Sequence, residues 1–468
     1  MAARAAAAAE DKRGPAASGL PAVGDLHAAT ADAPPQPPPP PHPGGLGELD
    51  LVGLLTNPFL GHGLVLQYLG NDTRAATALR GTCRGARDAV AAHRWHDTTT
   101  RVVWPGRWRG AFPAATAASV SREWDIDAED WVGRPPLLVD ADFVHFRGVR
   151  TLYMTGCNQD DITDGAFAHL AGIHTLDMCG CKLTTITDAA FAHLAGIHTL
   201  YMRGCRQATI SDAAFSHLAG IHTLEMCYCN QTTITDAAFA HLAGIHTLDM
   251  RGCDQATITD GAFGHLAGIH TLNMSGCNQH TISDAAFAHL AGIHTLDMRE
   301  CNQATITDAA FAHLAGIHKL YMGGCDQATI SDAAFAHLAG IHTLYMWGCS
   351  QASISDAAFA HLAGIHTLHM GDCNQHAITD AAFTHLAGIH TLYMDGCNQH
   401  TISDAAFSHL AGIHMLHMWG CSQETITDGA FAHLAGIHTL SMWGCSQATI
   451  TAACRARLRA AGIPVLIM

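Results

Sequence analysis

The chain has 468 residues and carries 24 basic against 40 acidic side chains, which gives a formal net charge of -16 with histidine neutral. This balance argues against a nucleic-acid backbone as the main partner, because no basic stripe is present to displace its counterions. No apolar stretch of about 18 residues, the length of a membrane span, runs without a polar interruption, so we expect no such span.

The first 48 residues are rich in alanine, proline and glycine and contain almost no large apolar side chain. Such a segment cannot offset the entropy lost on ordering, so residues 1–48 are predicted to be a disordered tail. Its alanine run lacks a Leu- or Val-rich core and is followed at once by acidic residues, which makes a poor signal peptide. The proline run Pro37–Pro41 is expected to stiffen this tail.

Residues 49–97 change to apolar helical patterning and predict two or three short helices, too small for a large core of their own. This segment resembles an F-box, the module that ties a substrate receptor to the adaptor of an SCF-type ubiquitin ligase. The resemblance implies that the adaptor would bind the apolar residues of the motif. These residues are Pro58, Val65, Leu66, Leu69, Leu79 and Cys83.

Three departures from the F-box pattern leave an alternative open. Asn57 stands where the family has a leucine, and residues 61–63 read Gly-His-Gly where helix formers are expected. The gap between Asp72 and Cys83 is also longer than the usual pattern. The alternative is that residues 49–97 form only a helical cap for the part of the chain that follows.

Residues 98–137 predict an irregular aromatic junction, with Trp104, Trp108, Phe112, Trp124 and Trp131 among Pro and Arg. A period begins at Leu138. Its isoleucine returns every 24 residues from Ile162 to Ile450, without insertion or deletion, and a fixed period of this length is typical of a solenoid. We expect residues 138–468 to form the array, with degenerate capping repeats at both ends.

Each repeat predicts one strand and one short helix. In the unit at Ile293, Leu296 and Met298 alternate with Asp297, as in a strand with one face buried. The segment Thr-Asp-Ala-Ala-Phe-Ala-His-Leu-Ala-Gly that follows has an N-cap, an apolar face and a closing glycine. Identical strands 24 residues apart should then stack in parallel.

The string I-H-T-L-D-M-R-E-C of this unit resembles the leucine-rich-repeat pattern LxxLxLxxN/C. The resemblance covers residues 138–468. Within this family the repeats are similar to two subclasses. One is the cysteine-containing subclass often found behind F-boxes, and the other is the bacterial surface type with an AF motif. Both imply an α/β solenoid with a parallel β-sheet on the concave face and short helices on the convex face.

Thirteen of the seventeen cysteines recur once per repeat, from Cys157 to Cys445. They form a single file that suits buried thiols bonded to loop backbone, not disulfides or zinc sites with paired ligands. We therefore expect an intracellular, reducing compartment, cytoplasmic or nuclear, and neither metal nor cofactor.

Histidine and aspartate also recur in files, His169 to His433, His174 to His438 and Asp164 to Asp428. Catalysis needs one group placed once beside a nucleophile or acid, so a file of identical groups predicts no catalytic residue. The histidines are predicted to make hydrogen bonds in the interior on the helix side, and each aspartate to supply charge at a helix N-terminus. Stacked imidazoles should resist joint protonation, so the array should loosen in acid.

Two positions differ between repeats whose other residues are copied almost unchanged. One lies between the strand Leu and Met, and the other directly follows that Met; the first half of the array is charged there and the second half aromatic. Exposed Tyr and Trp are typical interface anchors, so these positions predict a target-binding concave face. Its predicted residues are Tyr201, Arg203, Arg251, Tyr321, Tyr345, Trp347, Tyr393, Trp419 and Trp443.

Together these features predict a non-enzymatic substrate receptor that binds a protein target on its concave face and an SCF adaptor through residues 49–97. The alternative is a leucine-rich-repeat protein-interaction scaffold without a ubiquitin role, in which residues 49–97 serve only as a cap. For the two variable positions, the separate alternative is neutral drift at solvated positions after recent duplication.

Overall fold

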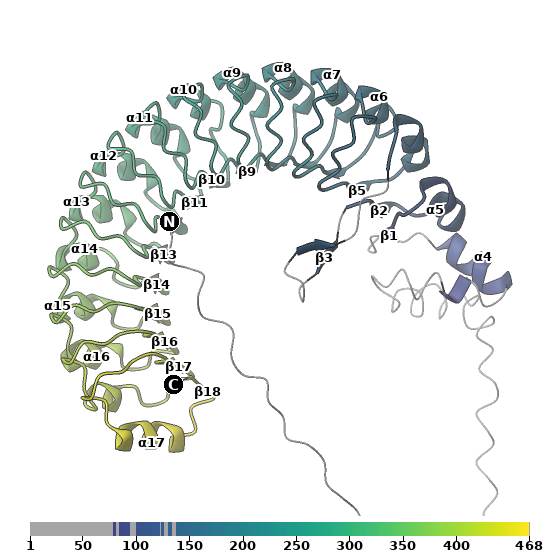
Figure 1. The fold of residues 1–468 in the computed structure, drawn as a ribbon. Helices are drawn as coiled ribbons and strands as arrows, with labels where there is room; N and C mark the ends of the chain where they lie inside the picture. Colours follow the sequence, from purple (N-terminus) through teal and green to yellow (C-terminus); the bar gives the residue numbers. More distant parts are fainter. Residues whose placement is uncertain are drawn as a thin grey trace, which may run out of the picture. The chain divides into compact units, whose positions relative to one another are not determined.

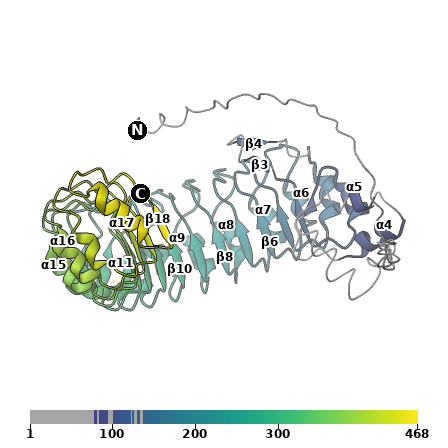
Figure 2. The ribbon, with the colours of Figure 1, turned by 90° about the horizontal axis from the view of Figure 1, so that it is seen from below.

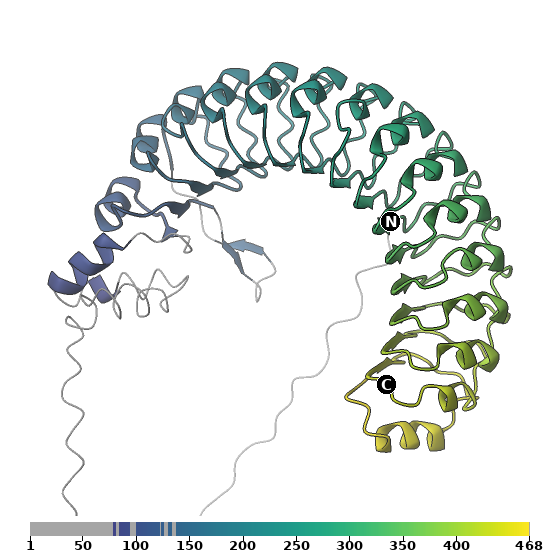
Figure 3. The same ribbon diagram turned by 180° about the vertical axis from the view of Figure 1, so that it is seen from behind.

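The computed structural model describes residues 78–80, 84–93, 100–121, 123–125, 130–132 and 137–467, all within one compact unit. In these residues sixteen strands form one parallel sheet, in which the spatial order follows the chain order from β1 and β2 through β5 to β18. The strands line the inner side of the curved array and the helices its outer side (Figures 1 and 3), and Figure 2 shows the strands as one ordered row. The predicted α/β solenoid is confirmed.

Most strands contain three residues, Thr-Leu followed by a variable residue, and neighbours pair in register, so that Leu248 lies beside Leu272 and Leu272 beside Leu296. The strands of the sheet are β1 (Thr100–Arg101), β2 (Ala117–Ser119), β5 (Thr151–Tyr153), β6 (Thr175–Asp177), β7 (Thr199–Tyr201), β8 (Thr223–Glu225), β9 (Thr247–Asp249), β10 (Thr271–Asn273), β11 (Thr295–Asp297), β12 (Lys319–Tyr321), β13 (Thr343–Tyr345), β14 (Thr367–His369), β15 (Thr391–Tyr393), β16 (Met415–His417), β17 (Thr439–Ser441) and β18 (Val465–Ile467).

Short helices alternate with these strands, and most consist of one α-turn continued by a 3₁₀ turn. The α-helices are α4 (Arg84–Ala92), α5 (Pro105–Ala111), α6 (Asp164–Phe167), α7 (Asp188–Phe191), α8 (Asp212–Phe215), α9 (Asp236–Phe239), α10 (Asp260–Phe263), α11 (Asp284–Phe287), α12 (Asp308–Phe311), α13 (Asp332–Phe335), α14 (Asp356–Ala360), α15 (Asp380–Phe383), α16 (Asp404–Phe407) and α17 (Ala452–Ala460). The 3₁₀ segments are η2 (Asp140–Phe146), η3 (Ala192–Leu194), η4 (Ser216–Leu218), η5 (Ala240–Leu242), η6 (Ala288–Leu290), η7 (Ala312–Leu314), η8 (Ala336–Leu338), η9 (Thr384–Leu386), η10 (Ser408–Leu410) and η11 (Ala430–His433).

The repeat at α9 shows why these residues form this unit. The Thr235 hydroxyl caps the helix by accepting a hydrogen bond from Ala237 N at 3.2 Å, because the first N–H groups of a helix have no partner within it. Ala238 and Phe239 are buried on its inner face. The chain then turns back at Gly244, whose φ of +82° a residue with a Cβ rarely adopts.

The sheet begins before Leu138, in the segment that the sequence predicted to be an irregular junction. Strand β1, helix α5 and strand β2 form a strand–helix–strand unit, in which buried Trp108 donates from Nε1 to Thr100 Oγ1 at 3.0 Å. Ala118 of β2 pairs with Leu152 of β5 across an insertion that carries the antiparallel hairpin β3 (Glu123–Asp125) and β4 (Asp130–Val132). This insertion breaks the 24-residue period and hides the unit from a periodicity argument.

Little of the predicted helical module falls within the described residues. Leu79 packs, partly buried, against the core, and α4 buries Ala86, Ala89 and Val90 in the same apolar cluster as Trp108. The other predicted adaptor-binding residues and the predicted tail at residues 1–48 lie outside the described residues. These adaptor-binding residues are Pro58, Val65, Leu66, Leu69 and Cys83.

The cysteine file lies in the core and bonds from one repeat to the next. The Cys301 thiol donates to Met274 O at 3.1 Å, and Cys325 donates to Met298 O at 3.1 Å. Each thiol thus pairs a loop carbonyl of the preceding repeat, as the sequence predicted. Every described cysteine is free of disulfide bonds.

The aspartate file also connects repeats, which goes beyond the local helix charge that the sequence predicted. Thr307 donates from its backbone N and from Oγ1 to the two carboxylate oxygens of Asp284, each at 2.7 Å. Each aspartate therefore opens its own helix and orients the capping residue of the next. At the end of the file, the hydrogen bonds from Thr451 hold the pKa of the Asp428 carboxyl below its usual range.

We expect Asp284→Ala to lower the free energy of unfolding by about 1–3 kcal/mol, because the Thr307 N–H loses its partner in a partly buried place. Urea unfolding followed by circular dichroism measures the change. Asp284→Asn keeps one acceptor oxygen and should lose less, and Ala285→Ser at the exposed neighbouring position should change little. Equal stability of Asp284→Ala and the unaltered protein would contradict this role.

Candidate functional site

The variable residues lie at two distinct places on the concave side. The strand position is the third residue of each strand, as in Tyr345, and its side chains are mostly half-buried. The turn position follows the buried Met and lies in the turn after the strand and not on the strand itself. Trp347, Trp419 and Trp443 occupy it and are 47%, 52% and 55% exposed.

The strand positions of the second half of the array form a continuous stack of rings, here called the aromatic ladder. Its successive ring centroids are 4.5, 5.5, 4.9 and 4.6 Å apart. Its members are Tyr321, Tyr345, His369, Tyr393 and His417. In-register parallel strands lie about 4.8 Å apart, which is a stacking distance, so the sheet itself orders these rings.

The prediction named the tyrosines of this ladder and left out His369 and His417, although both occupy the same repeat position. Burial lowers the pKa of the His369 imidazole, which favours its neutral form within the stack. The outward ring edges remain for a partner, because the ring faces cover one another. The Tyr393 hydroxyl already donates to Met415 Sδ at 3.5 Å, which leaves the hydroxyls of Tyr321 and Tyr345.

Trp347 stands between two glycines at the turn position. A Cβ on Gly371 would come within 2.7 Å of Trp347 Cδ1, so that glycine leaves the room in which the indole lies. Beside Gly323 the surface opens into a pocket of about 440 Å³, which is lined by Tyr321, Tyr345 and Trp347 together with Arg299 and Glu300. This pocket has the size of a binding site for one or two side chains of a partner.

Two of the arginines in the charged half are paired within their own repeats. Arg299 makes hydrogen bonds to both carboxylate oxygens of Asp297, the shortest at 2.5 Å, and Arg251 lies 3.2 Å from Asp249. Predicted Arg251 is therefore already neutralised and offers a partner less charge. A pair of this kind also holds both side chains in one geometry.

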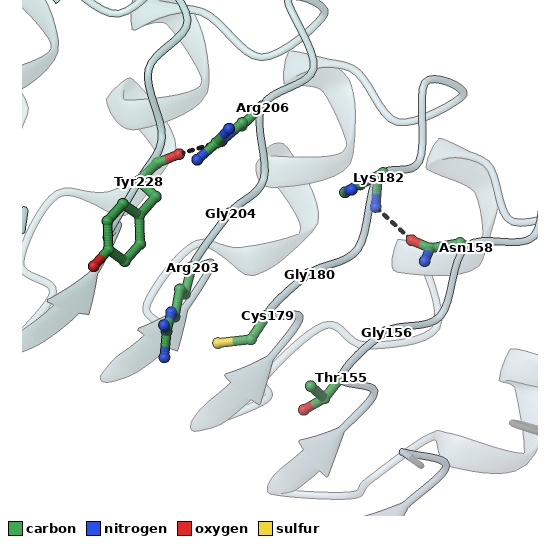
Figure 4. A pocket seen from close by; sticks show the side chains of 10 residues that line it. All are labelled: Thr155, Gly156, Asn158, Cys179, Gly180, Lys182, Arg203, Gly204, Arg206 and Tyr228. Atoms are coloured by element: carbon green, nitrogen blue, oxygen red, sulfur yellow. Dashed lines mark hydrogen bonds between the residues drawn. The ribbon is translucent and has the colours of Figure 1, made fainter. Parts of the chain in front are cut away.

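Predicted Tyr201 and Arg203 lie at the other end of the array, Tyr201 half-buried at its strand position and Arg203 exposed at its turn position. Arg203 borders a pocket of about 580 Å³, here called the basic pocket (Figure 4). Its guanidinium carbon is 5.4 Å from the centroid of the Tyr228 ring. The pocket is lined by Thr155, Gly156, Asn158, Cys179, Gly180, Lys182, Arg203, Gly204, Arg206 and Tyr228.

Lys182, Arg206 and Tyr228 are residues that the sequence interpretation missed. The signal was present in the repeats. Lys182 and Arg206 follow the core cysteine, where every other repeat from Asn158 to Ser446 carries Asn, Asp or Ser. Tyr228 precedes the core cysteine, where most repeats carry glycine.

Both histidine files lie at the surface and not in the interior, which corrects the prediction. Each side chain is exposed or half-buried. The file from His174 to His438 stacks ring on ring along the array at centroid distances of 4.5 to 4.6 Å, and His198 Nδ1 lies 3.0 Å from Thr199 Oγ1. We call this file the histidine ladder.

The described residues offer little support for metal or thiol chemistry. None of their His, Cys, Asp and Glu side chains gather in a group of three or more that could hold a metal ion. Burial raises the pKa of the Cys229 and Cys301 thiols to about 12, so both stay protonated near neutral pH. Within this part of the chain no helix has the length and apolar character needed to cross a membrane.

Solved structures of similar fold are leucine-rich-repeat proteins. A leucine-rich-repeat protein of Leptospira interrogans matches with a TM-score of 0.58 at 12% identity, over 79% of this chain and 89% of that one. Drosophila Toll, in its complex with Spatzle, matches with a TM-score of 0.55 at 14% identity, over 74% and 50%. TLR13, in its complex with ssRNA13, matches with a TM-score of 0.54 at 14% identity, over 76% and 55%.

These likenesses, together with the sheet and the 24-residue period, define the chain as a leucine-rich-repeat solenoid. The chain spans about half the length of the Toll and TLR13 chains that it matches. Neither a protein-family model nor a curated protein matches its sequence.

We expect the melting temperature to be lower at pH 5.5 than at pH 7.5. Partial desolvation, followed by the charge of the neighbouring imidazoles, lowers the pKa of His198, His246, His318 and His414. With a folded pKa below the unfolded value of about 6.5, the unfolded state binds more protons as the pH falls. The stability is therefore full above that value and declines below it.

Differential scanning calorimetry at the two pH values measures this dependence. The double variant His246→Asn/His318→Asn interrupts the histidine ladder at one exposed and one half-buried position and should reduce the pH difference. A melting temperature at pH 5.5 equal to or above that at pH 7.5 would exclude the mechanism.

Proposed function

We propose that this protein is a non-enzymatic binding protein that holds a protein target on its concave face. The aromatic ladder and the exposed Trp347, Trp419 and Trp443 carry this proposal. Large aromatic side chains contribute most of the binding energy at protein interfaces, and rings fixed by a sheet lose little entropy on binding. The repeated residues supply the rigid support, and the variable ones supply the recognition.

The spread of the aromatic residues along the sheet also favours a protein as the partner over a small molecule. The aromatic residues extend along consecutive strands from β12 to β17 instead of converging on one enclosed cavity. An extended row of anchors suits a partner surface or a peptide segment that crosses several strands. At Trp419 and Trp443 the indole rings meet edge to face at 4.8 Å, which adds a second anchor beyond Trp347.

The double variant Tyr345→Ala/Trp347→Ala is expected to weaken target binding by about 2 kcal/mol or more, the cost typical of interface hot spots, or roughly thirtyfold. Affinity capture from a cell extract with quantitative mass spectrometry identifies the target, and titration with it measures the loss. The melting temperature should shift by less than about 2 °C, because neither ring lies in the core.

The matched control is His313→Ala/His337→Ala, which removes two exposed rings from the helix side of the array. It should retain every captured protein. A large loss of stability in Tyr345→Ala/Trp347→Ala would place these residues in the core, and an unchanged set of captured proteins would remove the concave face from target binding.

We further propose that residues 49–97 recruit the adaptor of an SCF-type ubiquitin ligase, so that the bound target becomes its substrate. The support is the F-box resemblance of Pro58, Val65, Leu66, Leu69 and Cys83, together with Leu79. A second role for this segment is favoured by α4, which buries Ala86 and Val90 in the apolar cluster that also contains Trp108, as a cap would. The two roles are compatible, since a cap still presents an outer surface.

Co-purification of the full-length protein with the SCF adaptor tests the recruiting role. We expect the adaptor to be retained, and the variant Leu66→Asp/Leu69→Asp to lose it while still binding the target. If the unaltered protein retains no adaptor, the ubiquitin role fails and the general binding function stands alone.

A further inference from the structure

The basic pocket is unusual for a chain with a net charge of -16. Three cationic side chains, Lys182, Arg203 and Arg206, line it within two neighbouring repeats (Figure 4), and all three are exposed. None of them forms a salt bridge with a described residue, in contrast to Arg251 and Arg299 further along the array. Their charge is therefore available to a ligand.

The hydrogen bonds of the pocket orient two of these cations. Arg206 donates from Nε to the Tyr228 carbonyl oxygen at 2.8 Å, which fixes the plane of its guanidinium and leaves its terminal nitrogens without a bond to the described residues. Arg203 is held over the Tyr228 ring. The Tyr228 ring thus holds Arg203 at the pocket, and the Tyr228 main-chain carbonyl holds Arg206.

Tyr228 occupies this wall in a strained conformation. Its φ is +58°, at a repeat position where Gly204 and Gly252 on either side have φ of +69° and +63°. A Cβ on Gly252 would lie 2.5 Å from the Tyr228 ring, so the ring needs that glycine as its neighbour. Strain of this kind persists where the side chain has a use that a glycine cannot serve.

The chemistry of the pocket favours carboxylates spread along a peptide over a single phosphate. Many phosphate sites combine cationic side chains with free backbone N–H groups. Here Gly156, Gly180 and Gly204 donate theirs to carbonyl oxygens of the following repeat at 2.8, 2.6 and 2.8 Å. What remains are side-chain cations in successive repeats, about 4.8 Å apart along the sheet, which several side chains of an extended acidic segment would reach.

We propose that the basic pocket is the docking subsite for an acidic segment of the protein partner, rich in glutamate or aspartate. This assignment rests on the proposed protein-binding function and names the chemistry of one end of the partner. The acidic segment lies over Lys182, Arg203 and Arg206, and the aromatic ladder engages a different part of the same partner.

Fluorescence anisotropy with the full-length protein tests the assignment. The probe is a short fluorescein-labelled peptide in which glutamate alternates with serine. Binding is expected for this peptide, weakening as salt is added, with no binding for the same peptide carrying glutamine for glutamate. Tighter binding of a phosphoserine peptide without glutamate, or no binding of the glutamate peptide, would overturn the proposal.

The triple variant Lys182→Asn/Arg203→Ser/Arg206→Asn places in the pocket the residues that other repeats carry at these positions. It should bind the glutamate peptide at least about tenfold more weakly, because complementary charge is lost, and its melting temperature should be unchanged. Lys319→Thr likewise restores a repeat residue and removes a positive charge outside the pocket, and should bind within about twofold of the unaltered protein. Equal binding by the triple variant would overturn the assignment.

Tyr228→Gly separates a role in binding from a role in folding. The variant should melt at a higher temperature because the backbone strain is relieved. It should bind the glutamate peptide about threefold more weakly because Arg203 loses the ring that holds it, while the main-chain carbonyl that accepts from Arg206 is kept. A weaker fold with unchanged peptide binding would show that Tyr228 serves the fold alone and would overturn its place in the subsite.

The test also covers an acidic segment of the chain itself, because the sequence of strands β3 and β4 contains Glu123, Asp125 and Asp130. The chain enters it just after Ser121, whose Oγ accepts a hydrogen bond from Thr155 N at the pocket. The variant Glu123→Gln/Asp125→Asn/Asp130→Asn should bind the glutamate peptide as the unaltered protein does. A several-fold gain in affinity would instead assign the pocket to this hairpin.

The variant Tyr345→Ala/Trp347→Ala distinguishes this proposal from the function on which it rests. It should keep the affinity for the glutamate peptide and lose the captured target. If the unaltered protein ignores the peptide while the aromatic variant still loses its target, the acidic subsite fails and the binding function stands. If the aromatic variant loses nothing, the binding function itself fails.

Discussion

Hydrogen bonds that run from each repeat to the same place in the next hold this molecule together. Asp284 receives two bonds from Thr307, Cys301 donates to Met274 O, and Gln303 Nε2 donates to Cys277 O at 3.1 Å. Each of these bonds needs two neighbouring units in register, so no repeat can satisfy its polar groups alone. Buried polar groups without partners are costly, and register is therefore fixed at every step of the array.

The same register produces the functional surface. A side chain at the strand position of one repeat lies beside its equivalents in the neighbouring repeats, so that any two aromatic residues there stack. Tyr321 and Tyr345 do so at 4.5 Å, and so do members of the histidine ladder on its own row. The side chains of the binding face therefore need no additional residues to hold them in place. The pairing of the strands places them in a stack wherever neighbouring repeats carry an aromatic residue at the strand position.

Much of this arrangement could be predicted from the sequence, because a fixed period fixes which residues become neighbours. The strands, the helices, the core cysteines and the concave position of Tyr345 and Trp347 all follow from the spacing. The unit formed by β1, α5 and β2 could not be predicted in this way, because the insertion of β3 and β4 breaks the 24-residue period. The bridging role of Asp284 was also hidden, because a helix N-terminus is a sufficient local reason for an aspartate.

The basic pocket shows a different limit. Lys182 and Arg206 were visible as departures from Asn, Asp or Ser at the position after the core cysteine. This position is not one of the two that were identified as variable, and only two repeats carry a basic residue there. Their proximity to Arg203 and Tyr228 is a property of three neighbouring turns taken together. For the histidine ladder, periodicity predicted the stacking but not the exposure of its side chains.

The uniform stacking makes the distance between the basic pocket and the aromatic ladder a count of whole repeats. Each unit adds one strand spacing of about 4.8 Å and restores every hydrogen bond at its two new borders. A gain or loss of 24 residues between Tyr228 and Tyr321 would therefore leave the fold intact while lengthening or shortening the gap between two recognition elements. The spacing between the two recognition elements is therefore set in steps of one repeat. Duplication or loss of a repeat changes this spacing without any change of side chain.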